Sequence, residues 1–86
     1  MSPSPIELRP LARTVIVSGD ELTVHLADGR AITVPLVWFP RLLNATAVAR
    51  SRWELLEDGE GIHWPEADED LSVEGLLAGS RARGAA

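Results

Sequence analysis

Three short runs in the first half of the chain alternate apolar with polar residues, and this pattern constrains the fold most. The runs are Thr14 to Val17, Glu21 to Ala27 and Ala31 to Leu36, and the pairs Gly19-Asp20 and Asp28-Gly29 separate them. Alternation with a period of two is typical of strands that bury one face, and such pairs are typical of tight turns. The sequence therefore predicts a three-stranded antiparallel β-meander.

The loops of this meander must have lengths that place the apolar residues on one face. A two-residue type II′ turn at Gly19-Asp20 pairs Val17 with Leu22, which is in phase. The same turn between the second and third runs would be out of phase, so we expect a three-residue loop, Ala27 to Gly29, with its glycine left-handed. His25 then falls on the opposite face. The predicted apolar face consists of Val15, Val17, Leu22, Val24, Leu26, Ile32, Val34 and Leu36.

A second β-hairpin is expected further along the chain. Trp53 to Glu57 and Gly61 to Trp64 flank Asp58-Gly59, a pair that suits a two-residue type I′ turn. This turn pairs Leu55 with Ile62 and places Trp53 opposite Trp64, so that two large rings would anchor the hairpin.

Short helices are expected between and after the strands. Pro40 is a residue favoured in a first helical turn, and Thr46 suits the N-cap of a helix over Ala47 to Arg52. Ser72 suits the N-cap of a last helix, Val73 to Ala78. The predicted fold class is α+β: an antiparallel β-meander of three strands plus a second β-hairpin, with short helices between them and a C-terminal helix.

The length of 86 residues fits one small domain, which buries about 60 to 65% of the surface that its unfolded chain exposes. We expect a flexible N-terminal segment over 1–12, a single domain over 13–79 and a flexible tail over 80–86. No apolar run approaches the ~20 residues of a membrane span, the first residues do not resemble a secretory signal, and the sequence contains no cysteine. These features predict a cytoplasmic protein that does not contact a membrane.

The net charge of −5 is distributed unevenly along the chain. Residues 1–53 carry six Arg and four acids, whereas residues 54–86 carry two Arg and nine acids. An acidic half repels phosphate backbones, so no nucleic acid is expected to bind this chain alone. A basic protein partner is the class that this charge favours.

One group of residues resembles a set of metal ligands. His63 is followed by Glu66, Asp68, Glu69 and Asp70, but the spacing lacks the glycine of a calcium-binding loop. Neither histidine is accompanied by a nucleophile motif, a cysteine or a lysine, and no phosphate-binding loop occurs. The sequence predicts no enzyme, no metal and no cofactor. A metal-dependent or hydrolytic enzyme centred on His63 and the acidic cluster is left open as an alternative.

The segment Trp38-Phe39-Pro40-Arg41 follows the third strand, at a place where we expect other elements to leave the end of a small sheet uncovered. Trp and Arg are enriched at the centres of protein interfaces, so an exposed part of this segment would be a partner-binding patch. Together with the acidic cluster it gives the candidate partner-binding residues Trp38, Phe39, Arg41, Glu66, Asp68, Glu69 and Asp70.

Two long stretches, LADGRAITVPLVWFPRLLNAT (26–46) and RWELLEDGEGIHWPEADEDLSVEGLLAG (52–79), carry a resemblance to a known family. The chain resembles the domain of unknown function 2442 family of small bacterial proteins. The resemblance implies a compact α+β domain with no established activity and no catalytic residues, and some members resemble the antitoxin halves of toxin-antitoxin pairs. We therefore expect a non-catalytic protein-binding module that masks a basic partner, with a homodimeric structural or regulatory domain as another alternative.

Overall fold

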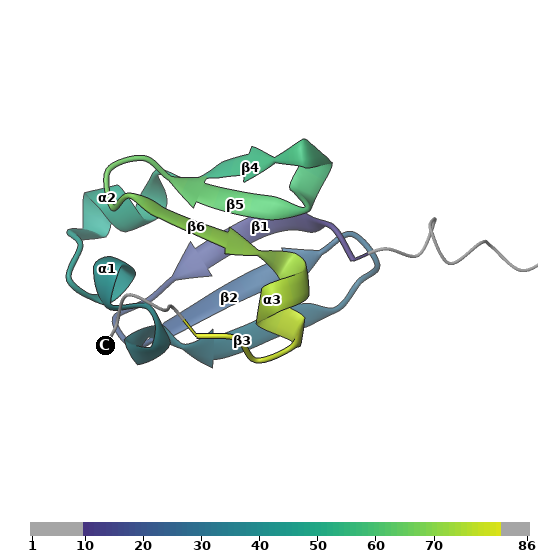
Figure 1. Ribbon diagram of the computed structural model, residues 1–86, viewed down its shortest axis with the longest axis horizontal. Coiled ribbons are helices and arrows are strands. Elements are labelled where there is room, and N and C mark those ends of the chain that lie inside the picture. Colours follow the sequence, from purple (N-terminus) through teal and green to yellow (C-terminus); the bar gives the residue numbers. More distant parts are fainter. Residues whose placement is uncertain (1–9, 82–86) are drawn as a thin grey trace, which may run out of the picture.

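The computed structural model describes residues 10–81, which form two antiparallel sheets and several short helices (Figure 1). Sheet A has the order β1-β2-β3 and consists of Ala12–Val17, Glu21–Leu26 and Ala31–Pro35. Sheet B has the order β4-β5-β6 and consists of Glu54–Leu56, Gly61–Trp64 and Glu69–Ser72. The helices are η2 (Leu36–Trp38), α1 (Pro40–Leu43), α2 (Ala47–Ser51), η3 (Glu57–Gly59) and α3 (Val73–Leu77). The fold is the predicted α+β class.

The predicted flexible segments, 1–12 and 80–86, lie for the most part outside the described residues. Of their described residues, Ala12 is buried and opens β1. The Ser80 N–H donates to the Gly75 carbonyl (2.9 Å), and the Gly79 N–H donates to the Leu76 carbonyl (3.1 Å). This pair of bonds is the Schellman pattern that ends a helix with a left-handed glycine, and Gly79 has a φ of 79°.

Sheet A has the predicted register. Val17 pairs with Leu22, and Val24 pairs with Ile32 across the three-residue loop whose glycine, Gly29, has a φ of 95°. In that loop, hydrogen bonds from Arg30 lower the pKa of Asp28, and the Asp28 carboxylate raises the pKa of Arg30. The eight residues predicted for the apolar face are all buried or partly buried, and His25 on the other face is exposed.

The first turn of sheet A differs from the prediction. A type II′ turn requires a positive φ at its first central residue, and Gly19 lies outside the left-handed region. The Ser18 hydroxyl bridges the turn by accepting a hydrogen bond from the Glu21 N–H (3.0 Å). The length of the turn, and hence the register, is unaffected.

Sheet B contains the predicted hairpin and a further strand. Leu55 pairs with Ile62, and both Asp58 (φ 60°) and Gly59 (φ 112°) have the positive φ of a type I′ turn. The ladder begins at Glu54, so the predicted pair of Trp53 with Trp64 is not part of it. The residues after the hairpin return as β6, which pairs antiparallel with β5.

The two predicted side-chain caps are present. Thr46 Oγ1 accepts a hydrogen bond from the Ala49 N–H (3.0 Å) at the start of α2, and Ser72 Oγ accepts one from the Gly75 N–H (2.9 Å) at the start of α3. Both helices end one residue earlier than predicted. These caps fix where the short helices begin.

The core lies between the inner faces of the two sheets, and Figure 1 shows sheet B in front of sheet A, with α3 next to β3. Trp64 is fully buried there, and its indole N–H donates to the Arg50 carbonyl (3.0 Å). Each buried Leu, Ile or Phe side chain contributes roughly 1.5–3 kcal/mol relative to an exposed one. The fully buried side chains are Trp64, Phe39, Leu22, Leu36, Leu42, Ile62, Val24 and Val73.

Candidate partner-binding surface

Two of the predicted partner-binding residues lie inside the protein. Phe39 is 1% exposed and belongs to the core, and Glu69 is 8% exposed. Glu69 pairs with Trp64 in the sheet, and the alternation along β6 turns both side chains to the inner face. Neither residue therefore contributes to an exposed binding surface, which corrects the interpretation of the sequence.

Two exposed acids of the predicted cluster pair with arginines of the same chain. Arg52 Nη1 lies 3.0 Å from Glu66 Oε2. Arg41 Nη1 donates to the Asp68 carbonyl (2.6 Å) and lies 3.6 Å from Asp68 Oδ2. Exposed pairs of this kind contribute about 0.2–1 kcal/mol each, but they compensate the local negative charge. The structure thus brings together Arg41 and Asp68, two of the predicted partner-binding residues, and their opposite charges compensate each other.

Asp70 is held by His63 across the ladder between β5 and β6. The two residues face each other in register, and His63 Nδ1 is hydrogen bonded to Asp70 Oδ1. Their side chains are 31% and 70% exposed on the outer face of sheet B. Among residues 10–81, no three His, Cys, Asp or Glu side chains gather as metal ligands. The pair can orient an imidazole, but in the described part of the chain it forms no metal centre.

Trp38 is half-buried, and the cationic side chain of Arg81, the last described residue, lies over its ring. The Arg81 guanidinium carbon lies 4.6 Å from the centroid of the Trp38 ring. Beside it, Val37 is 63% exposed. A cation over an aromatic face contributes about 0.5–1 kcal/mol at an exposed site. The predicted aromatic patch is therefore partly covered by the chain itself.

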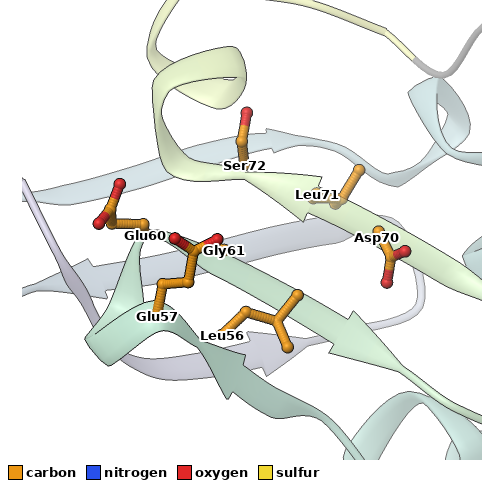
Figure 2. Close-up of a pocket in the computed structure, with 7 residues that line it drawn as sticks. All are labelled: Leu56, Glu57, Glu60, Gly61, Asp70, Leu71 and Ser72. Atoms are coloured by element: carbon orange, nitrogen blue, oxygen red, sulfur yellow. The ribbon is translucent and has the colours of Figure 1, made fainter.

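A pocket that the sequence did not indicate lies on the outer face of sheet B (Figure 2). In register, Leu56, Gly61 and Ser72 lie side by side across β4, β5 and β6. Gly61 has no side chain, so the face is hollow between its two neighbours. The pocket has a volume of about 360 Å³ and is lined by Leu56, Glu57, Glu60, Gly61, Asp70, Leu71 and Ser72.

The strand beside this pocket exposes apolar side chains at the edge of the sheet. Within the described part of the chain, β4 pairs only with β5. Leu55 is 37% exposed and Leu56 is 39% exposed. An edge strand with open backbone groups and apolar side chains is a template for pairing with another chain. The signal in the sequence was the run Leu55-Leu56 close to the Asp58-Gly59 turn, but the hydrophobicity of such a run alone predicts that it is buried.

The fold and the site define a small two-sheet α+β domain with an exposed sheet edge and an acidic, partly apolar pocket. The chain belongs to the DUF2442 family, described as proteins of unknown function, whose model matches residues 12–82. In the described residues, no helix is long and apolar enough to span a membrane.

Two solved structures of bacterial proteins are similar to this chain. One is a crystal structure of a protein of unknown function from Rhodospirillum rubrum, with a TM-score of 0.74 and 30% identity over 90% of this chain and 95% of that one. The other is a solution NMR structure of an uncharacterized protein from Chromobacterium violaceum, with a TM-score of 0.71 and 24% identity over 84% of this chain and 68% of that one. The second likeness shows the fold alone. No curated protein matches the chain.

Proposed function

We propose that this protein is a non-catalytic protein-binding module of the cytoplasm, which binds its partner through β4 and the outer face of sheet B. The observation that carries the proposal is the exposure of Leu55 and Leu56 on an edge strand. Main-chain hydrogen bonds along such an edge supply affinity, and the neighbouring side chains supply specificity.

The charges around β4 favour a basic partner. Glu54, Glu57 and Asp58 are exposed on the strand and its turn, and the whole chain carries a net charge of −5. A negative surface attracts a positive one and speeds their encounter, while apolar contact holds the complex. Masking of a basic protein, as an antitoxin masks its toxin, is the form of binding that these features support best.

The region around Trp38 and Arg41 is the less favoured surface. Arg41 is engaged with Asp68, and Arg81 lies over the Trp38 ring, so a partner would have to displace contacts made within the chain. Within residues 10–81, no strand pairs with the open side of β4, so no backbone pairing there would have to be displaced.

Photo-crosslinking tests the proposed surface. A benzophenone amino acid replaces Leu56 in one variant and Thr14, an exposed residue of β1, in a matched control. Irradiation in the cells that make the protein is expected to give an adduct with a basic protein from position 56 and none from position 14. Equal labelling at both positions, or no adduct at position 56, would contradict the proposal. An adduct with a second copy of the chain would replace it with the homodimer.

A further inference from the structure

Gly61 is the first residue of β5, and its backbone conformation does not require a glycine. Its φ lies outside the left-handed region. A Cβ atom built there would lie 3.4 Å from the Leu71 carbonyl oxygen and 3.5 Å from the Leu56 Cβ, which is ordinary van der Waals contact. Glycine weakens a strand and often marks a position where a ligand or another chain approaches closely. The missing side chain at Gly61 is what leaves the pocket open.

The walls of this pocket combine an apolar side with carboxylates. Leu56 forms the apolar side, and Figure 2 shows the Glu57 and Asp70 carboxylates on either side of it. One oxygen of Asp70 is hydrogen bonded to His63, and its other oxygen has no hydrogen-bond partner within residues 10–81. Within the same residues, no hydrogen bond or ion pair engages the Glu57 side chain. Both carboxylates can therefore accept from an incoming donor.

We propose that the pocket over Gly61 accepts the side chain of an arginine or lysine from the partner, an inference that rests on the proposed function. The aliphatic part of the side chain would lie on Leu56, because long basic side chains bury their stems along apolar surface. The cationic head would reach Glu57 and Asp70, where a charged donor meets charged acceptors. The volume of about 360 Å³ lies at the small end of ligand pockets, which suits one side chain rather than a cofactor.

The probe is N-acetyl-arginine N-methylamide, titrated into the ¹⁵N-labelled full-length chain. The citrulline analogue has nearly the same shape but no charge, so it isolates the contribution of the carboxylates. Saturable shifts of the amide signals of Gly61, Leu71 and Ser72 are expected with the arginine probe. Binding of the citrulline probe is expected to be about two- to fivefold weaker, as for an exposed ion pair. Equal binding of both probes, or shifts that do not saturate, would overturn the proposal.

Two variants at the pocket and one away from it complete the experiment. Gly61→Val fills the pocket and is expected to abolish the saturable shifts, and Gly61→Ala keeps ordinary contacts in case valine disturbs the strand. Gly19→Ala is the matched control, because a Cβ at Gly19 meets nothing within 4 Å. Undiminished arginine binding in Gly61→Ala and Gly61→Val would contradict the proposal.

The two proposals fail in different ways. A crosslink at position 56 without binding of the arginine probe would leave the binding module standing and remove the basic side chain from its pocket. Arginine binding without a crosslink would leave a cation pocket and remove the proposed partner surface.

Discussion

Gly59 makes a tight contact that connects the two sheets at the level of a single residue. It is buried in the turn between β4 and β5, with a φ of 112°. A Cβ atom there would lie 2.5 Å from the Ala12 carbonyl oxygen and 2.9 Å from the Ala12 nitrogen. We expect Gly59→Ala to lower the free energy of unfolding by roughly 2–4 kcal/mol, because left-handed strain adds to a clash with the backbone of β1.

Urea unfolding of the full-length chain, followed by tryptophan fluorescence, measures this loss. Gly19→Ala serves as the comparison, since its new methyl group meets open space, and it should stay within about 0.5 kcal/mol of the parent chain. If Gly59→Ala were as stable as Gly19→Ala, this result would contradict the close contact between Gly59 and the backbone of β1.

Single residues were predictable from the sequence where their role depends on near neighbours. Gly29 needs only the loop length of its own hairpin, and Thr46 and Ser72 need only the N–H groups three residues ahead. Phe39 and Glu69 were assigned to the surface, yet both are buried. Their burial depends on how η2, α1 and sheet B pack together, and no local pattern carries that information.

At the scale of elements, β6 is the strand that the sequence did not reveal. Its residues, Glu69–Ser72, place a carboxylate at an inward position, which breaks the apolar alternation of a half-buried strand. Glu69 Oε1 accepts a hydrogen bond from the Asp70 N–H (3.1 Å), and Oε2 is buried without a hydrogen-bond partner in residues 10–81. In the sequence, the acids before α3 therefore resemble residues that precede a helix. In the structure, the backbone of the same residues adds a third strand to sheet B.

The short helix α2 depends on its cap, because five residues are too few for a helix to be stable alone. We expect Thr46→Ala to lower the free energy of unfolding by about 1 kcal/mol, since the Ala49 N–H loses its acceptor. Thr46→Ser keeps the hydroxyl and should retain most of the stability. Thermal unfolding followed by circular dichroism compares the two, and equal losses in both variants would assign the effect to the Thr46 methyl group rather than to the cap.

At the scale of the whole molecule, the sequence predicted the uneven charge but not which acids are compensated. Glu66 and Asp68 pair with Arg52 and Arg41, residues that precede them by 14 and 27 positions. Such distant pairs follow from the docking of sheet B beside α1 and α2, which composition cannot show. Among residues 10–81, the exposed acids Glu54, Glu57 and Asp58, on β4 and the turn that follows it, form no ion pair with an arginine, and they lie next to the pocket over Gly61.

This difference predicts which acids speed the encounter with a basic partner. Glu54→Gln/Glu57→Gln and Glu66→Gln/Asp68→Asn each remove two negative charges, so any effect of net charge alone is the same in both. We expect the first variant to bind the partner captured at position 56 roughly three- to tenfold more slowly at low salt, with a weaker salt dependence. The second variant should change the association rate less, because its carboxylates already face Arg52 and Arg41. Stopped-flow association at several salt concentrations measures both rates. Equal slowing would mean that the partner responds to the total charge of the domain and not to the acids beside β4.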